Sequence, residues 1–214
     1  MTADPAKLAE IANAQRGLFT RRQARECGYS IYQVRRRLDT AEWQVFLGPV
    51  LASAGLVRTP ALTDRAAWLA VPGAVLAGPS AARLHGMPVP SGRAWLAVPV
   101  SAHLRIPEVG VLRGRVSRFD LAVVDGMLVT ERARTVFDCL RVLPERPAEE
   151  LLDRALQQRW TTLDDLTGRL RAAAGRRGVS RLVRLVSRAG SGTRSAAERL
   201  AVDLLRRGRV GGWV

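Results

Sequence analysis

The amino-acid sequence predicts an α+β fold in three parts, and three observations lead to this prediction. Helix-capping residues recur before residue 40. From about residue 90 to 130, short segments with the pattern of strands are bounded by glycines and prolines, and after residue 130 the apolar residues follow helical spacing. The parts are residues 1–51, with helices and a hairpin, residues 52–190, a mixed α+β body with a helical second half, and residues 191–214. A hydrophobic fraction of 47% and a charged fraction of 25% are typical of globular proteins, so we expect a packed core.

Two short helices are predicted before residue 28. Apolar spacing indicates the first, from Ala6 to Ala14. The second starts after Thr20, because Gln23 stands three residues later and completes a capping box, in which each side chain binds the other residue's backbone amide. Gly28 suits the left-handed conformation that ends a helix, so this second helix is only a few residues long.

A third helix is predicted from Ser30 to Leu38, because Ser30 and Gln33 repeat the capping box directly after the glycine turn. At about 100° per residue, Ile31, Val34 and Leu38 share one face of this helix, which we expect to pack inward. Two capped helices joined by a tight glycine turn are the sequence form of a helix-turn-helix.

A short hairpin is predicted after the third helix. Trp43, Val45 and Leu47 alternate with other residues before Gly48 and Pro49, as in a hairpin with one buried face. The helix-turn-helix and this hairpin together predict a winged helix-turn-helix, in which the hairpin is the wing.

The body is predicted to contain short strands first and helices later. The predicted strands, which are bounded by Gly or Pro, are Ala94–Val98, Val109–Leu112 and Met127–Val129. The predicted helices, which have apolar residues at helical spacing, are Ser80–Leu84, a helix capped by Thr130, Ala148–Gln158, Leu163–Ala173, Arg181–Arg188 and Ala196–Arg207. Glycines within 175–178 and 190–192 indicate hinges, and we place a domain boundary at the second of them.

The basic charge of the chain is concentrated at its two ends. The net charge of +15 divides into +3 over residues 1–51, +2 over residues 52–168 and +10 over residues 169–214. The predicted helix-turn-helix carries a series of arginines between Arg16 and Arg37 that are opposed only by Glu26. Such clustering favours a polyanionic partner, nucleic acid before membrane. The alternative is a basic surface that is merely solvated.

The predicted helix-turn-helix indicates which side chains contact double-stranded DNA. The major groove admits one α-helix, and Arg and Gln side chains bind base edges there through paired hydrogen bonds. Base contacts are therefore predicted for Tyr32, Gln33 and Arg36. Phosphate contacts are predicted for Arg21, Arg22, Arg35 and Arg37, together with amide groups at the helix starts of Thr20 and Ser30. The alternative is that these arginines solvate an ordinary helical hairpin.

The sequence contains no signature of catalysis, of a metal site or of a membrane segment. The histidines, His85 and His103, and the cysteines, Cys27 and Cys139, lie at no spacing typical of metal ligands or of a catalytic dyad. No apolar run approaches the roughly 20 residues that cross a bilayer, and the N-terminal residues lack the pattern of a secretory signal. We therefore expect a cytoplasmic protein that is not an enzyme and has no cofactor and no membrane partner.

Short motifs follow one another in a fixed order along the first 51 residues. They are Gly17-Leu18-Phe19-Thr20, Gln23-Ala24, Gly28-Tyr29-Ser30, Val34-Arg35-Arg36-Arg37-Leu38, Trp43 and Gly48. Together they resemble the N-terminal winged helix of the AbiEi family, the antitoxins and autorepressors of type IV toxin-antitoxin systems. The chain departs from this pattern at Pro49-Val50-Leu51, where the family has a Val-Tyr ending. The resemblance implies an autorepressing, DNA-binding transcriptional regulator whose partner is a nucleotidyltransferase-like toxin.

Two longer motifs lie in the body. They are Ser80-Ala81-Ala82-Arg83-Leu84-His85-Gly86 and Thr130-Glu131-Arg132-Ala133-Arg134-Thr135-Val136-Phe137-Asp138. Both resemble signatures that recur in actinobacterial AbiEi-like proteins. Arg134 and Asp138 are one helical turn apart, which predicts an ion pair rather than a ligand site. His85 is likewise expected to be a packing or capping residue.

A last motif lies close to the C-terminal end of the sequence. It consists of Ser195-Ala196-Ala197-Glu198-Arg199-Leu200, then Leu204-Leu205 and Gly208. It resembles the opening helix of a very-short-patch-repair-like endonuclease domain. Catalysis in that fold needs an Asp and a Glu-x-Lys pair on later strands to hold a divalent cation. The sequence reaches Val214 before either, so Glu198 is a single carboxylate and we expect no metal-dependent nuclease activity.

Three functions remain open from the sequence: a DNA-binding regulator of the AbiEi type, the front part of a truncated endonuclease-domain protein, and an RNA-binding protein. A neighbouring toxin gene would favour the first, and downstream nucleotides that code for an Asp and a Glu-x-Lys pair would favour the second. The third is the weakest, because no aromatic platform on which single-stranded bases could stack is evident in the sequence.

Overall fold

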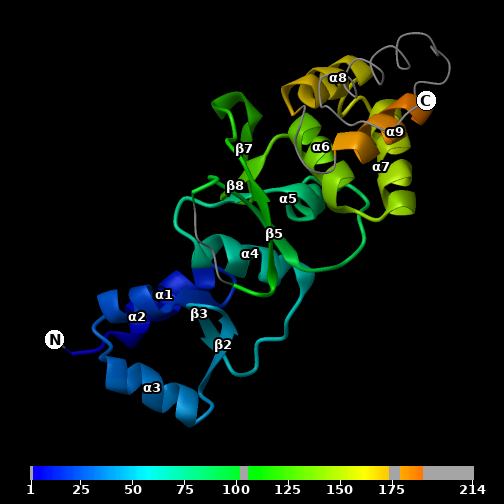
Figure 1. Ribbon diagram of the computed structural model, residues 1–214. Coiled ribbons are helices and arrows are strands. Elements are labelled where there is room, and N and C mark those ends of the chain that lie inside the picture. The colour runs from blue at the N-terminus through cyan, green and yellow to red at the C-terminus, as the bar shows by residue number, and fades with distance from the viewer. Residues whose placement is uncertain (1, 102–105, 174–178, 190–214) are drawn as a thin grey trace.

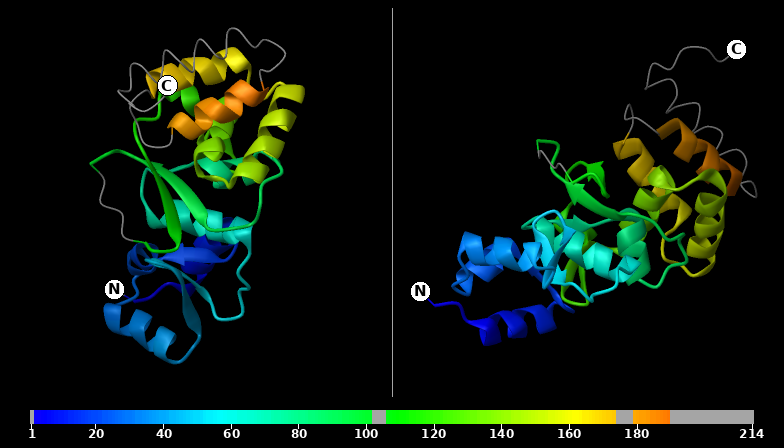
Figure 2. Two further views of the ribbon diagram at one scale, coloured as in Figure 1. Left: turned by 45° about the vertical axis from the view of Figure 1, so that its right-hand side comes forward. Right: turned by 90° about the horizontal axis from the view of Figure 1, so that it is seen from below.

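The computed structural model describes residues 2–101, 106–173 and 179–189, and the structural statements below concern these residues. The chain has an α+β fold, as the sequence predicts. Figures 1 and 2 show a small N-terminal unit at one end, a sheet with helices packed beside it in the middle and a group of helices at the other end. The predicted helix Ala196–Arg207, the segment 191–214 and the hinges at 175–178 and 190–192 lie outside the described residues.

The N-terminal unit consists of three helices and a three-stranded antiparallel sheet. Its elements are α1 (Pro5–Ala14), β1 (Leu18–Thr20), α2 (Arg21–Glu26), α3 (Ile31–Asp39), β2 (Trp43–Leu47) and β3 (Val50–Ser53). The strand order is β1-β3-β2. Strand β1 was not predicted, because three residues before a helix cap are too few to show an alternating pattern. It pairs with β3, with Thr20 opposite Val50, and so holds the start of α2 against the end of the hairpin.

Both predicted capping boxes are present and define the starts of α2 and α3. At α2, the Gln23 amide donates to Thr20 Oγ1 at 3.1 Å and the Thr20 amide donates to Gln23 Oε1 at 2.8 Å. The same two bonds join Ser30 and Gln33 at the start of α3. Between the helices, Gly28 has a φ of +85°, and a Cβ there would lie 2.5 Å from the Thr2 carbonyl oxygen. A glycine is therefore required at this turn.

The hairpin differs from the prediction in which side chains it buries. A β-bulge interrupts the pairing of β2 with β3 between Val45 and Leu47, so the strict alternation of the two faces is lost. Phe46 and Leu47 are both buried, whereas Val45, expected on the buried face, is 45% exposed. The prediction of Val45 as a core residue was wrong, because one extra residue in a strand reverses the faces beyond it.

The N-terminal unit and the body share one hydrophobic core. Phe46 of β2 belongs to the same cluster of buried side chains as Ala66 of α4 and Leu96 of β5. Asp125, in the β7–β8 turn of the body, also pairs with Arg16 after α1 at 2.9 Å. The predicted boundary at residue 51 falls inside β3, so the chain does not divide there into independently packed parts.

The body begins with a mixed five-stranded sheet and two helices. Its elements are α4 (Pro60–Ala70), β4 (Val75–Leu76), α5 (Gly78–Leu84), β5 (Ala94–Val98), β6 (Val109–Arg113), the 3₁₀ helix η1 (Arg118–Asp120), β7 (Leu121–Val124) and β8 (Met127–Thr130). The strand order is β6-β5-β4-β8-β7, with β5–β6 and β4–β8 parallel. The three predicted strands are β5, β6 and β8; the other two were missed, as was α4, which lies between this sheet and the N-terminal unit (Figure 1).

Four helices pack together in the second half of the body. They are α6 (Arg132–Val142), α7 (Glu145–Gln157), α8 (Leu163–Ala172) and α9 (Val179–Ala189), close to the predicted ranges. The N-cap of α6 is Glu131, whose carboxylate accepts from the Ala133 and Arg134 amides. The predicted cap, Thr130, is instead the last residue of β8, and its hydroxyl bonds that of Thr135 at 2.7 Å. The strand therefore runs one residue further than the cap pattern suggested.

The two body motifs form buried polar contacts within the fold. Arg83 of the first motif pairs with Asp64 of α4, with its Nε 2.8 Å from one carboxylate oxygen. His85 Nε2 lies 2.8 Å from the Thr130 carbonyl oxygen and so joins the end of α5 to β8. In the second motif, Arg134 Nε donates to Asp138 at 2.9 Å, as the i,i+4 spacing predicts. These contacts give the polar residues Arg83, His85, Arg134 and Asp138 of the two motifs a structural role.

A second polar cluster joins the sheet to the helical half of the body. Asp120, at the end of η1, accepts from Arg134 at 3.1 Å and from Arg169 of α8 at 2.8 Å. Arg169 also donates to Glu131 at 3.1 Å. Burial raises the pKa of the Asp120 carboxyl, but the hydrogen bonds and charges of Arg169 and Arg134 outweigh burial, so the pKa is lowered from its usual value.

The lowered pKa of Asp120 makes part of the stability dependent on acid. The contribution of Asp120 to the free energy of unfolding is fully present above the pKa of an aspartate in the unfolded chain, about 4. It is lost as the pH falls through the lower pKa that Asp120 has in the folded protein. We expect Asp120→Asn to lower the free energy of unfolding at pH 7 by about 1–3 kcal/mol and to flatten its decrease below about pH 4. Urea titrations between pH 2.5 and pH 7 measure this. If the free energy of unfolding of the variant decreases below about pH 4 as steeply as that of the unmodified protein, other carboxylates cause the loss of stability in acid.

Candidate nucleic-acid interface

A basic hollow lies between α2 and the β2–β3 turn of the N-terminal unit. It is lined by Arg21, Arg22, Arg25, Glu26 and Pro49, which we call the arginine hollow. The Arg21 amide donates to the Pro49 carbonyl oxygen at 3.0 Å, which holds the turn against the start of α2. The hollow therefore has a rigid floor, made by a capped helix and a hydrogen-bonded turn.

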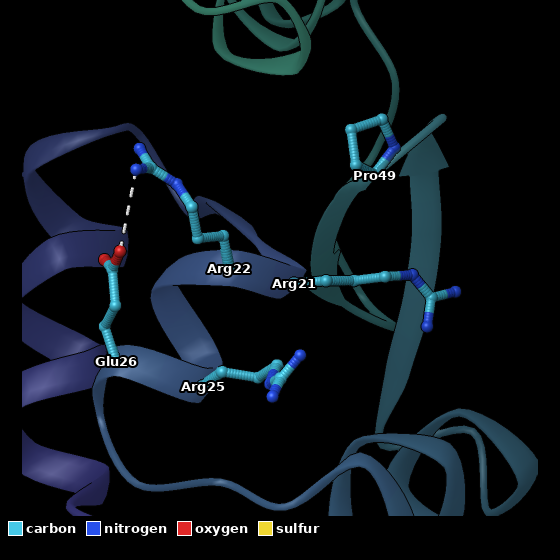
Figure 3. A pocket seen from close by; sticks show the side chains of 5 residues that line it. All are labelled: Arg21, Arg22, Arg25, Glu26 and Pro49. Atoms are coloured by element: carbon cyan, nitrogen blue, oxygen red, sulfur yellow. Dashed lines mark ion pairs between the residues drawn. The ribbon is translucent and has the colours of Figure 1, made fainter.

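The arginines of this hollow differ in how far their charge is neutralised. Arg22 turns to Glu26, with Nη1 3.6 Å from Oε1, and both side chains are exposed, so the attraction is weak. Figure 3 shows Arg21 and Arg25 extending away from this pair, toward the hairpin whose turn contains Pro49. Within the described part of the chain, neither of these two guanidinium groups has a carboxylate partner. The hollow thus presents at least two uncompensated positive charges.

The exposed side of α3 carries both arginines and apolar residues. Its members, which follow one another at i, i+1, i+4 and i+5, are Ile31, Tyr32, Arg35 and Arg36; we call them the α3 outer side. Arg35 lies 3.8 Å from Asp39, and both side chains are exposed, so this pair is also weak. Among the described residues, Arg36 has no ion-pair partner. Val34 is buried on the opposite side and anchors the helix.

Two of the predicted DNA-contacting residues lie elsewhere on α3. Gln33 points back to the helix start, where its Oε1 accepts from the Ser30 amide at 2.7 Å. Arg37, for which the sequence predicts a phosphate contact, stacks over the rings of Tyr29 and Trp43, with its guanidinium carbon 5.0 and 5.3 Å from the ring centres. Gln33 and Arg37 thus both make contacts within the N-terminal unit. The capping box in one case and the aromatic rings in the other hold these side chains.

Ile31 is also misplaced by the sequence pattern. It shares the predicted apolar face with Val34 and Leu38, but its side chain is 69% exposed, whereas Val34 is buried and Leu38 half-buried. The expectation that Ile31 packs inward was wrong, because the first residue of the helix lies beyond the core to which the later turns of α3 contribute. An apolar side chain therefore joins the α3 outer side.

Several of the helix-start amides predicted to bind phosphate already have partners. The amides of Thr20 and Gln23 are used within the first capping box, and that of Arg21 by the Pro49 carbonyl oxygen. Ser30 Oγ likewise accepts from the Gln33 amide at 3.1 Å. Side-chain guanidinium groups, rather than these amides, are the groups left to bind an anion. Arg25, which the sequence did not place in the site, could have been found from its i+4 spacing to Arg21.

Comparisons with known proteins and the remaining structural features add no other site. No protein-family model and no curated protein shows a significant match to this chain. Cys27 and Cys139 are buried free thiols, and the described residues contain no cluster of three or more His, Cys, Asp or Glu side chains that could hold a metal ion. None of the helices in the described ranges is both long and apolar enough to cross a bilayer.

Proposed function

We propose that the N-terminal unit is a winged helix-turn-helix that binds duplex DNA and that the protein is a transcriptional regulator. The element order from α1 to β3 is the one that such a unit requires, with α3 as the recognition helix and the β2–β3 turn as a short wing. The observation that carries the proposal is a set of exposed arginines that have no carboxylate partner among the described residues, Arg21, Arg25 and Arg36, on the two helices of the helix-turn-helix.

These arginines are better explained by binding than by stability. Exposed like charges on neighbouring helices repel one another and contribute nothing to the core, whereas a DNA backbone supplies the opposing charge. In this proposal Arg21, Arg22 and Arg25 bind phosphates beside the wing. The α3 outer side enters the major groove, where Arg36 meets a base edge and Arg35 a base or phosphate. Gln33 and Arg37 support the helix from behind.

The biological role that we propose follows from the motif resemblance rather than from the fold. An AbiEi-type antitoxin would act in the cytoplasm, repress its own promoter and have a nucleotidyltransferase-like toxin as its partner. The motifs of the body are held in structural contacts, so they do not themselves identify the surface that such a partner would bind. Co-purification with the product of a neighbouring toxin gene tests this role separately from DNA binding.

The test of DNA binding separates phosphate contacts from base contacts. A duplex selected from a random-sequence library by repeated rounds of binding serves as the probe, with dissociation constants measured by fluorescence anisotropy. We expect log affinity to fall linearly with log salt, with a slope of about −0.9 per phosphate neutralised. Arg21→Ala and Arg25→Ala should weaken every duplex alike and make this slope shallower. Arg36→Ala should relax the preference at one position by about 1–3 kcal/mol.

The matched control is Arg154→Ala, which removes an exposed arginine of α7, far from the proposed interface. It is expected to leave both affinity and salt slope unchanged. A flat salt profile for the unmodified protein would contradict the proposal. So would an Arg154→Ala variant that weakens binding as much as Arg21→Ala, because the effect would then follow from net charge alone. Structured RNA in place of the duplex tests the RNA-binding alternative.

A further inference from the structure

The first turn of α3 exposes an apolar side chain beside the arginines of the α3 outer side. Ile31 is the first residue of α3 and is 69% exposed, and Tyr32 beside it is 74% exposed. Burial of the apolar surface of either side chain would be favourable, and the folded chain does not use it. Each is followed four residues later by an arginine, Arg35 or Arg36, on the same side of the helix.

The position of Ile31 is held firmly by its surroundings. The capping box of Ser30 and Gln33 defines the backbone of the first turn, and Val34 anchors that turn in the core. A β-branched side chain in a helix also has one strongly preferred rotamer. The Ile31 methyl groups are therefore presented in one orientation, without the loss of side-chain freedom that a flexible residue would suffer on binding.

The arginines beside Ile31 restrict what can cover it. A purely apolar partner surface would bury Arg35 and Arg36 without counter-charges, which is costly. The suitable partner has an apolar group within a polyanion. The major groove of DNA has one such group, the 5-methyl of thymine, which apolar side chains contact there. N-terminal residues of a recognition helix are the ones that reach base edges.

We infer that Ile31 is a specificity-determining residue that contacts the 5-methyl group of a thymine in the major groove. This inference rests on the proposed DNA-binding function and identifies one base of the site. Ile31 and Arg35 are about one helical turn apart, roughly 5–6 Å, whereas successive base pairs are spaced by about 3.4 Å. The thymine therefore lies within about two base pairs of the position that Arg35 or Arg36 contacts.

Replacing thymine by uracil tests this contact, because only the methyl group is removed. Each thymine of the selected duplex is changed to deoxyuridine in turn, and the dissociation constant of the full chain is measured by fluorescence anisotropy. At one position, replacing thymine by uracil should raise the dissociation constant about fourfold, because the contact that buries one methyl group is lost. With Ile31→Ala, thymine and uracil at that position should bind equally. Ile31→Val, which keeps a branched side chain, should retain part of the difference.

The other outcomes separate failure of this inference from failure of the proposed function. If binding remains steeply salt-dependent but no uracil substitution matters, or if Ile31→Ala leaves the uracil effect intact, the inference is wrong and DNA binding stands. A selected site without an invariant thymine also overturns the inference. If Ile31→Ala instead changes the mass of the protein in solution by light scattering, the residue contacts a second copy. Absence of any salt-dependent binding overturns the proposed function itself.

Discussion

Replacement of Asp64 by alanine is expected to lower the free energy of unfolding by about 3–5 kcal/mol, because it leaves a buried guanidinium without its counter-charge. Asp64 is 1% exposed, and its two carboxylate oxygens accept from Nε and Nη2 of Arg83 at 2.8 and 2.7 Å. The Ser80 hydroxyl also donates to Asp64, while its oxygen accepts from the Trp95 amide at 2.7 Å. One carboxylate therefore connects α4, α5 and β5.

The loss is expected to be large because, among the described residues, Arg83 has no second carboxylate partner. Arg83 otherwise donates from Nη2 to neutral oxygens, the Ser80 hydroxyl at 3.1 Å and the Arg93 carbonyl at 3.4 Å. Its Nη1 is buried and has no hydrogen-bond partner among the described residues, so the alternative to Asp64 is a further unsatisfied charge. Urea unfolding monitored by circular dichroism measures the effect. The double variant Asp64→Leu with Arg83→Met, which removes both charges, should recover most of the loss.

An exposed ion pair provides the control for the Asp64 variant. Arg146 and Glu150 are 3.0 Å apart on α7, with both side chains exposed. Arg146→Ala should change the free energy of unfolding by less than about 1 kcal/mol. If Asp64→Ala costs no more than this control, Arg83 has access to water and the pair is not the buried link between the three elements.

Replacement of Phe46 by alanine is expected to cost about 3–5 kcal/mol, the usual range for removing a buried aromatic side chain. Phe46 is 0% exposed and lies in the cluster that the N-terminal sheet shares with α4 and β5. The cavity would therefore open where the proposed DNA-binding unit meets the body. We expect the N-terminal unit to unfold at a lower urea concentration than the helical half, which separates one transition into two.

Val45 is the matched control, because it is the adjacent residue of the same strand and is exposed. Val45→Ala should change the free energy of unfolding by at most about 0.5 kcal/mol. Tryptophan fluorescence, which reports on Trp43 and on the tryptophans of the body, follows both variants. A loss for Val45→Ala as large as that for Phe46→Ala would mean that Val45 is also buried, which would contradict its exposure in the structure.

The sequence by itself determined the elements whose stabilising contacts are local. Both capping boxes consist of hydrogen bonds between residues three apart, so the starts of α2 and α3 could be predicted correctly. The Arg134–Asp138 pair is likewise a contact across one helical turn. Strands β5, β6 and β8 were found because their apolar residues are bounded by Gly or Pro, whereas β4, with two residues, is too short to form a pattern.

Tertiary structure alone decided which of the side chains of α3 remain available for a partner. Ile31 and Val34 have the same helical phase, yet only Val34 reaches the core, because the first turn of α3 extends beyond it. Arg36 and Arg37 are neighbours in the chain, yet Arg37 is held by the rings of Tyr29 and Trp43 while Arg36 faces solvent. Helical periodicity gives the direction of a side chain but not what lies opposite it.

Contacts between residues that are far apart in the chain could likewise not be predicted from the sequence. Asp120 and Arg169 are 49 residues apart, and Asp64 and Arg83 are brought together only by the packing of α4 on α5. The bulge that buries Phe46 adds one residue to β2 relative to β3, which no composition signal in the hairpin reveals. Local hydrogen bonds and periodicity determine where helices and strands form, whereas the packing of those elements against one another decides which charges are paired, which are buried and which remain for a partner.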